Sequence, residues 1–338
     1  MDTGIIKKVT VKSVMESLGR MGRVIAPVRQ DDAFVFSSLP AGETPDLSYP
    51  NSKLSPKGCL FPQTEVLFFY DCQGEDHQVS PPKEESGITC LVGVRPCDAR
   101  AMALIDPVFD DPQYKDTYYL QRRKNMVIIG LACAEPQSTC FCTSTGGSPF
   151  DTTGMDMLWQ DLGDRYLVKA VTPRGQELLS GFGEIEKAEK KDLAEAQKQA
   201  EKTLSAMSPI FDTEKIGERL SSSFGDSLWQ EIHEKCLGCA VCTFVCPTCH
   251  CFDIQDEKNH DRGRRVRLWD SCMFPLFTLH TSGHNPRSSG KERMRQRIMH
   301  KFNYFKTNNG QIACVGCGRC IKECPVNMDI RQIVSVYS

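Results

Sequence analysis

Hydrophobic residues in the first half of the chain form short runs with the length and composition of β-strands. The runs Cys90–Val94 and Val127–Leu131 are continuously apolar, which is typical of strands buried on both faces of a sheet. Ala99–Ile105 between them reads as a short helix, so these segments predict a βαβ unit. A helix is also predicted over Val11–Met21, and strands over Val24–Pro27, Phe34–Ser37, Val66–Tyr70, Thr89–Val94 and Met126–Ala132. We therefore expect an α/β domain over residues 1–215, with a polar, partly helical connection over 110–125.

One long helix is predicted near the end of the first domain. Ile185–Met207 is rich in Ala, Glu, Lys and Gln and predicts a helix that ends before Pro209. Its narrow apolar stripe consists of Leu193, Ala196, Ala200, Leu204 and Met207. Because the rest of its surface is charged, this helix is expected to be a peripheral brace or an arm that contacts a partner.

A second domain is expected over residues 225–338, after the serines at 221–223. Helix-forming segments such as Lys291–Phe302 favour an α-helical, ferredoxin-like domain with two metal clusters; a strand-rich ferredoxin is the alternative. The predicted fold class is therefore α+β, with an N-terminal α/β domain followed by the helical domain.

Two cysteine runs in this second region carry the clearest chemistry. They are Cys236-x2-Cys239-x2-Cys242-x3-Cys246-Pro and Cys314-x2-Cys317-x2-Cys320-x3-Cys324-Pro. This spacing is that of the bacterial ferredoxin run, in which the fourth cysteine binds the other of two [4Fe–4S] clusters. We assign one cluster to Cys236, Cys239, Cys242 and Cys324, and the other to Cys314, Cys317, Cys320 and Cys246. A pair of zinc sites is the alternative, although zinc does not require the trailing Cys-Pro.

Small residues inside both runs fit this interpretation. Gly238, Ala240, Gly316 and Gly318 allow backbone amides to approach the inorganic sulfurs of a cluster.

Four cysteines in the first domain predict a possible third cluster. Cys97 follows one apolar strand, and Cys133, Cys140 and Cys142 follow the next. If the two strands are parallel neighbours, their carboxyl ends meet at one edge of the sheet, where ligands commonly bind. Four thiolates there would suffice for another [4Fe–4S] cluster.

The remaining cysteines have other interpretations. Cys59, Cys72 and Cys90 are expected to be small buried hydrophobic residues. Cys249, Cys251 and Cys272 either pack beside a cluster and tune it, or form another metal site with His250.

Composition places the chain among globular proteins with metal or redox cysteines. Its 338 residues include 18 cysteines, and the N-terminus lacks the apolar stretch of a signal peptide. No apolar run is long enough to span a bilayer. We therefore expect a protein of the reducing cytoplasm, where cysteines bind metals rather than form disulfides.

Charge is distributed unevenly along the chain. Residues 231–338 hold 16 Lys plus Arg against 10 Asp plus Glu, a net charge of +6, whereas residues 1–230 carry −8. The basic segments Arg262–Arg267 and Lys291–Arg297 could raise the reduction potential of nearby anionic clusters. They could also be solvated or partner-facing helix faces, and no nucleic-acid module accompanies them, so no nucleic-acid partner is expected. No dinucleotide-binding or phosphate-binding glycine motif is present.

Several motifs together carry a resemblance that covers nearly the whole chain. They are Gly93–Asp98 (GVRPCD), Cys133–Pro136 (CAEP), Thr139–Ser144 (TCFCTS), Cys246–Cys251 (CPTCHC), Trp269–Phe274 (WDSCMF), Gly283–Pro286 (GHNP) and Cys314–Cys320 (CVGCGRC). In these the chain resembles the 4Fe–4S dicluster family. That family includes an iron–sulfur component of anaerobic sulfite reductases, the beta subunit of soluble sulfhydrogenases, and iron–sulfur subunits of flavin oxidoreductase and heterodisulfide reductase complexes.

The resemblance implies an electron-transfer subunit rather than a catalytic one. It implies a flavoprotein partner that oxidises NAD(P)H and a terminal module of hydrogenase, sulfite reductase or heterodisulfide reductase type. Flavin is then expected on the partner, since flavins convert a two-electron hydride donor into single electrons. The alternatives are a self-sufficient iron–sulfur oxidoreductase that binds a flavin or substrate itself, and a structural or sensory iron–sulfur protein.

Overall fold

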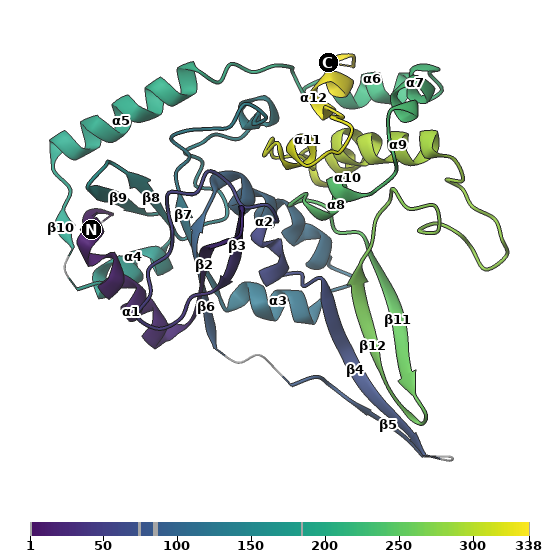
Figure 1. Ribbon diagram of the computed structural model, residues 1–338, viewed down its shortest axis with the longest axis horizontal. Coiled ribbons are helices and arrows are strands. Elements are labelled where there is room, and N and C mark those ends of the chain that lie inside the picture. Colours follow the sequence, from purple (N-terminus) through teal and green to yellow (C-terminus); the bar gives the residue numbers. More distant parts are fainter. Residues whose placement is uncertain (1, 74–75, 84–86, 184, 338) are drawn as a thin grey trace.

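Two β-sheets and the helices around them form the molecule (Figure 1). The computed structural model describes residues 2–73, 76–83, 87–183 and 185–337. In this described part the larger sheet has eight strands in the order β10-β1-β9-β8-β7-β6-β2-β3, and β2, β6, β7 and β8 run parallel. Its strands are β1 (Thr3–Lys7), β2 (Gly22–Gln30), β3 (Ala33–Ser38), β6 (Ile88–Val94), β7 (Met126–Leu131), β8 (Met157–Asp161), β9 (Arg165–Ala170) and β10 (Glu186–Lys187).

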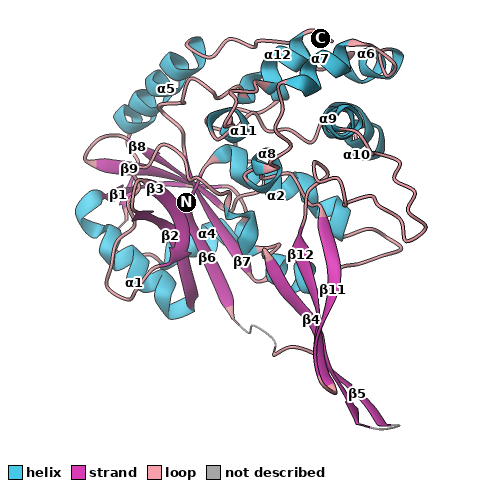
Figure 2. Ribbon diagram, turned by 45° about the vertical axis from the view of Figure 1, so that its right-hand side comes forward, coloured by secondary structure: helices cyan, strands magenta, loops and turns pink. Residues whose placement is uncertain are grey.

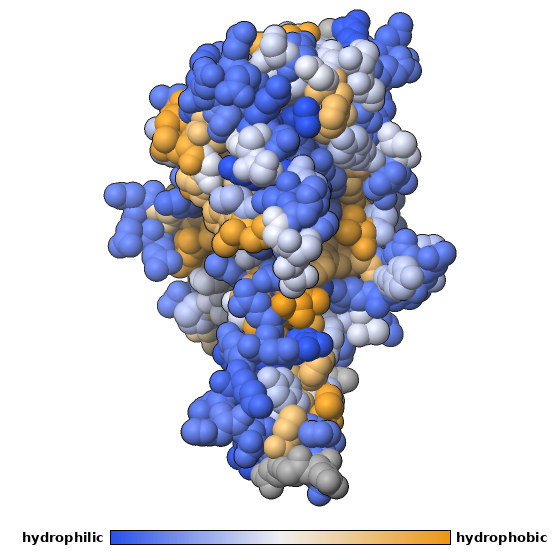
Figure 3. Space-filling model, turned by 90° about the vertical axis from the view of Figure 1, so that its right-hand side faces the viewer, coloured by the Kyte–Doolittle hydropathy of each residue, from blue (hydrophilic) through white to orange (hydrophobic). Residues whose placement is uncertain are grey.

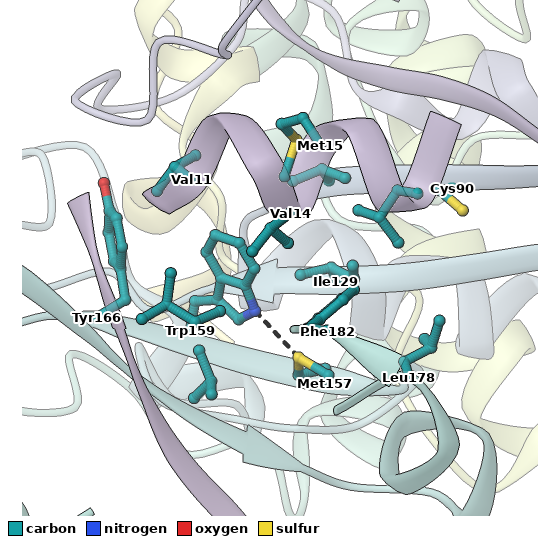
Figure 4. Packing of buried hydrophobic residues seen from close by; sticks show 14 of the residues in the cluster. Val11, Val14, Met15, Cys90, Ile129, Met157, Trp159, Tyr166, Leu178 and Phe182 are labelled. Atoms are coloured by element: carbon teal, nitrogen blue, oxygen red, sulfur yellow. Dashed lines mark hydrogen bonds between the residues drawn. The ribbon is translucent and has the colours of Figure 1, made fainter. Parts of the chain in front are cut away.

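Helices cover both faces of this sheet, which explains its continuously apolar central strands. Successive side chains of a strand point to opposite faces. Val127 and Ile129 of β7 accordingly pack in one core with α1 and α4, while Ile128 packs in another core with α2 and α3. Figure 4 shows the first core, in which Trp159 Nε1 donates a hydrogen bond to Met157 Sδ at 3.0 Å. The helices are α1 (Val11–Met21), α2 (Pro96–Phe109), α3 (Thr117–Lys124) and α4 (Pro173–Gly181).

The second sheet joins distant parts of the chain. Its order is β11-β12-β4-β5, and β4 pairs with β12 from Thr64↔Leu268 to Asp71↔Arg262. The four strands are β4 (Thr64–Gln73), β5 (Asp76–Ser80), β11 (Phe252–Asn259) and β12 (Arg262–Trp269). They project as an arm (Figure 2), whose visible surface is largely hydrophilic with a few hydrophobic residues (Figure 3). The division of the chain at residues 215–225 stays a prediction, and this sheet spans it.

Short helices build the region that carries the ferredoxin runs. A separate hydrophobic core holds them together, in which the Trp229 and Tyr337 rings stack with centroids 5.3 Å apart. These helices are α6 (Ile216–Ser222), α7 (Leu228–Glu234), α8 (Val241–Phe244), α9 (Gly290–Met299), α10 (Phe305–Asn309), α11 (Arg319–Lys322) and α12 (Ile330–Ser335). A π-helical turn, His300–Tyr304, joins α9 to α10, and 3-10 turns occupy Lys8–Thr10, Pro56–Cys59 and Cys142–Thr145.

The long helix predicted over Ile185–Met207 is shorter than expected. It is α5 (Lys190–Ser205), because Glu186 and Lys187 pair with β1 instead. A capping box between Glu189 and Asp192 starts the helix. The predicted apolar stripe is wrong in part: Ala196 is buried, whereas Leu193 and Leu204 are exposed. Polar contacts, such as the hydrogen bond from Gln160 Nε2 to the Ala196 carbonyl at 2.8 Å, hold much of this helix against the sheet.

The basic segment Arg262–Arg267 is a strand rather than a helix face. Across the hairpin, Arg264 and Arg265 pair with Glu257 and Asp256 on β11. Carboxylates on β11 balance the charges of exposed Arg264 and half-buried Arg265, and the expectation that this segment acts on a cluster stays a prediction.

The predicted mixture of helices and sheets is confirmed, and the α+β class fits it. The two-cluster region is not purely helical, because the β11–β12 hairpin lies between its cysteine runs. No helix in the described residues is both long and apolar enough to cross a bilayer.

Arg267 anchors the arm at its base, and replacing it tests that role. This 4 % exposed side chain forms ion pairs with Glu65 on β4 and with Asp116. We expect Arg267→Met to lower the free energy of unfolding by about 3 kcal/mol, because Asp116 loses its ion pair with Arg267 and buried Glu65 keeps, among the described residues, only Arg122 as a cationic partner. Denaturant unfolding of the anaerobic protein, followed by circular dichroism, measures the change.

The matched control is Arg264→Gln, which removes an exposed ion pair and should cost less than about 1 kcal/mol. Equal losses in both variants would contradict the anchoring role of Arg267.

Candidate iron–sulfur centres

The first cysteine run and the last cysteine of the second run face a common cavity. Cys236, Cys239, Cys242 and Cys324 all line it, together with Cys320. Backbone amides approach two of these sulfurs: the Gly238 N–H donates to Cys236 Sγ at 3.4 Å, and the Met328 N–H donates to Cys324 Sγ at 3.2 Å. The arrangement is compatible with the expected exchange of the fourth ligand.

The other four cysteines lie together on the inner side of the same region. Burial raises the pKa values of Cys314, Cys317 and Cys320. Lys301 Nζ lies 3.2 Å from Cys246 Sγ and donates to the carbonyl of Ala313, the residue before Cys314, at 3.0 Å. Cys246 therefore lies beside the start of the second run, as the predicted ligand set requires. Thiols with raised pKa values stay protonated in water, but iron displaces the proton when it binds.

The two loops have matching local structures. Each of the short helices α8 and α11 begins after a residue in the left-handed conformation, Ala240 with φ 64° and Gly318 with φ 71°. This conformation turns the loop sharply, and it places the third cysteine of each run inside the helix that follows.

Gly316 and Gly318 also allow the N-terminal region to approach the second run. A Cβ atom at Gly316 would lie 2.4 Å from the Phe141 carbonyl carbon, and one at Gly318 would lie 2.5 Å from the Thr139 oxygen. The Phe141 N–H donates to the Gly316 carbonyl at 2.8 Å. Glycine is thus required at both positions by close backbone contact as well as by its dihedral angles.

The third cysteine group assembles at this contact. Strands β6 and β7 are parallel neighbours, as predicted, so Cys97 and Cys133 emerge at the same edge of the sheet. Burial raises the pKa of Cys140 to about 11 and that of Cys142 to about 12, and the neighbouring Cys133 charge contributes to both. Cys133 in turn contributes to the raised pKa of Cys97. These charge interactions link the four side chains, but in the part of the chain that the structure describes no group of three or more Cys, His, Asp or Glu is close enough to hold a metal ion.

This third group also adjoins the second ferredoxin run. Cys140 Sγ lies 3.9 Å from the Cys317 carbonyl oxygen, and Cys97 packs with Cys317 around the same small apolar cluster. Three groups of cysteines consequently follow one another through the protein.

A buried ion pair fastens the third group to the second. Arg319 of α11 binds Asp98 of α2 with two hydrogen bonds of 2.7 Å, and the two side chains are 3 % and 0 % exposed. Asp98 follows Cys97 directly, while Arg319 lies between Cys317 and Cys320. Bidentate pairs of this kind fix orientation as well as distance.

Buried cations beside the cysteines test whether the site fits an anionic cluster. Lys301 Nζ lies 3.2 Å from Cys246 Sγ, Arg297 Nη1 lies 3.6 Å from Cys249 Sγ, and both side chains are buried. Burial alone would lower the pKa of Lys301, yet the adjacent cysteine charges raise it. Neither cation has a carboxylate partner among the described residues. A buried uncompensated charge costs several kcal/mol, so thiolates that carry a cluster fit this environment.

Arg95 is a buried cation beside the third cysteine group, and it likewise indicates that an anionic group fits there. Its guanidinium lies over the Tyr49 ring at 4.6 Å and lowers the pKa of Cys133, which burial raises overall. Its Nε is buried without a hydrogen-bond partner among the described residues. An anionic group held by these cysteines would compensate this charge.

Cys249, Cys251 and Cys272 belong to none of the three groups, although Lys57 Nζ donates to the carbonyls of both Cys249 and the predicted ligand Cys246. They line a cavity of about 280 Å³ with His250, Arg297 and Lys301. A hydrogen bond between Cys251 and Cys272, together with the nearby cations, holds the pKa of Cys251 at about 6. Desolvation lowers the pKa of His250 to about 4, so this imidazole is neutral near pH 7.

The cysteines expected to be structural lie elsewhere. Cys90 is fully buried in the sheet core, as predicted, whereas Cys59 and Cys72 are partly exposed.

Sequence reasoning missed the buried cations as a group. The sequence marks Lys291–Arg297 only as a basic surface, but Arg297 points inward. Its spacing of four from Lys301 places both on one side of a helix, and this is the signal that could have identified them. Lys57 has no such signal; it donates to the Cys249 carbonyl at 2.7 Å from a distant turn.

Comparison with known proteins agrees with the cysteine patterns. The family described as "4Fe-4S dicluster domain" matches residues 235–328. Sulfhydrogenase 2 subunit beta of Pyrococcus furiosus is 32 % identical over 315 residues, which cover 92 % of this chain and 91 % of that protein. No solved structure matches. These findings support two [4Fe–4S] clusters in place of the zinc alternative.

The exchange of fourth ligands can be tested by combining substitutions. Cys324→Ala alone should remove about 4 iron atoms per chain, because one cluster loses a ligand. The double variant Cys236→Ala/Cys324→Ala should lose no more, whereas Cys314→Ala/Cys324→Ala should lose about 8. Iron and acid-labile sulfide analysis of the anaerobic protein measures these losses.

Cys72→Ala is the control and should retain all its iron. The ligand sets would be wrong if the Cys236 double variant lost about 8 iron atoms and the Cys314 double variant only about 4.

Proposed function

Because this chain belongs to the 4Fe–4S dicluster family that includes sulfhydrogenase 2 subunit beta, we propose that it passes electrons within an oxidoreductase complex of the cytoplasm. Its partners are a flavoprotein that oxidises NAD(P)H and a terminal module of hydrogenase, sulfite reductase or heterodisulfide reductase type. The flavin belongs to the partner. The observation that carries this proposal is the continuity of the cysteine groups from the exposed Cys239 to the N-terminal sheet.

The bound clusters would supply one-electron transfer. Cys236, Cys239, Cys242 and Cys324 would hold one of them, and Cys314, Cys317, Cys320 and Cys246 the other. The protein would hold them against an apolar core, with only Cys239 of these eight cysteines exposed. Lys301 and Arg297 stabilise added negative charge, which raises the reduction potential.

The third cysteine group extends the same path. Cys97, Cys133, Cys140 and Cys142 would hold a third [4Fe–4S] cluster beside the Cys317 ligand. The close contact between Cys140 and Cys317 supports electron transfer between these two positions.

The third cluster predicts a metal count. The fully loaded chain should contain about 12 iron atoms with matching sulfide, and Cys97→Ser or Cys140→Ser should each lower this to about 8. Cys72→Ser should leave the count unchanged. A wild-type value of about 8 that neither Cys97→Ser nor Cys140→Ser alters would exclude the third cluster.

A second prediction concerns the electron donor. The isolated, flavin-free chain should not be reduced by NADH or NADPH, because its sequence contains no recognisable dinucleotide-binding motif and flavins commonly split a hydride into single electrons. Adding a flavoprotein subunit of the same complex should restore reduction. Anaerobic mixing followed by cluster absorbance measures it, and dithionite reduction of the same sample shows that the clusters are competent.

Rapid bleaching by NADH without any partner would contradict the transfer role. It would instead favour the self-sufficient oxidoreductase.

A further inference from the structure

The base of the β11–β12 hairpin holds two cysteines that neither ferredoxin run uses. Cys251 directly precedes β11, and Cys272 follows β12. Phe252 pairs with Trp269 at the end of the ladder, and the Asp270 N–H donates to the Cys251 carbonyl at 3.0 Å. The hairpin therefore places Cys251 opposite Asp270, two residues before Cys272, and both cysteines line the same cavity.

The two thiols also interact with each other. The Cys272 side chain and backbone N–H are neighbours that lower the pKa of Cys251, while the Cys251 side chain raises the pKa of Cys272. The third nearby thiol, Cys249, hydrogen-bonds to Cys246 instead. Cys251 and Cys272 thus interact with each other, while Cys249 interacts with Cys246. This favours a dithiol formed by Cys251 and Cys272 over a metal site with three equivalent cysteine ligands.

The pair faces a cationic cavity. Arg287, Arg297 and Lys301 line the 280 Å³ space together with the imidazole of His300. Cations next to a cysteine favour the thiolate, the form that reacts in thiol–disulfide chemistry. Both cysteines are only partly buried, so protons can exchange with solvent.

The pair also lies close to one of the electron carriers. Cys249 connects the cavity to Cys246, a ligand of the inner cluster in our assignment. Lys301 lines the cavity and lies 3.2 Å from Cys246 Sγ. Electrons therefore need to cross only a short distance between the thiols and that cluster.

We propose that Cys251 and Cys272 form a redox-active dithiol that exchanges an electron pair with the clusters. On oxidation two S–H bonds break, one S–S bond forms, two protons leave to water, and two electrons pass singly to oxidised [4Fe–4S] clusters. Reduction reverses each of these changes. The dithiol thus stores two electrons beside carriers that each move one. This proposal requires the two clusters of the family but neither the third cluster nor a particular partner.

The test uses the full chain with its clusters intact. The anaerobic protein is equilibrated with mediators at a series of potentials, quenched in acid, alkylated and digested for mass spectrometry. We expect a Cys251–Cys272 disulfide that forms and disappears reversibly, with a tenfold change in the disulfide-to-dithiol ratio for each change of about 30 mV. Iron content should stay constant throughout.

Variants distinguish the dithiol from metal ligation. Cys251→Ser and Cys272→Ser should each abolish the two-electron couple while iron and cluster absorbance stay unchanged, and Cys72→Ser should retain the couple. Loss of iron in both cysteine variants would overturn the proposal and identify the thiols as metal ligands. Absence of the disulfide at every potential, or its formation through Cys249, would overturn it as well.

Discussion

The ion pair between Arg319 and Asp98 is the contact on which the arrangement of the cysteine groups depends. It joins α11, which holds Cys320 of the second ferredoxin run, to the first turn of α2, which holds Cys97. The remaining Arg319 donors bind Ser52 and Asn51, so the guanidinium is fully satisfied although it is buried. Electron transfer between metal centres requires fixed separations. Separating Arg319 from Asp98 would leave two buried charges uncompensated, so this ion pair is suited to fix the separation of the cysteine groups.

Around this contact, the other buried cations form a matching charge pattern. Lys301 and Arg297 face the cysteines of the two-cluster region, and Arg95 faces those of the N-terminal sheet. In an ordinary globular core such cations would be paired with carboxylates. Here cysteine sulfurs lie beside Lys301 and Arg297 instead. Under the proposed function, loss of the clusters would leave these two cations without a counter-charge.

The sequence was most informative where spacing follows directly from chemistry. The ferredoxin runs and the parallel β6–β7 pair could be predicted because cysteine spacing and apolar runs are local signals. The β11–β12 hairpin could not be predicted, because its charged strands lack an alternation of apolar and polar residues. Pairing with β4, nearly 200 residues away in the sequence, stabilises it instead. The start of α5 was misplaced for a similar reason, since pairing with β1 overrode helix propensity at Glu186 and Lys187. Arg297 points inward because of tertiary packing. The positions of basic residues along the chain do not show which of them the packing buries.

The arm sheet also limits how this chain can be divided. Strands β4 and β12 are adjacent in the sheet but lie on opposite sides of residues 215–225. A protein cut there would expose a long row of unpaired N–H and C=O groups on each fragment, and such edges pair readily with other chains. The pairing of β4 with β12 therefore links the two predicted domains through backbone hydrogen bonds. A gene fusion or fission that separated the two halves would have to supply a new strand for each edge.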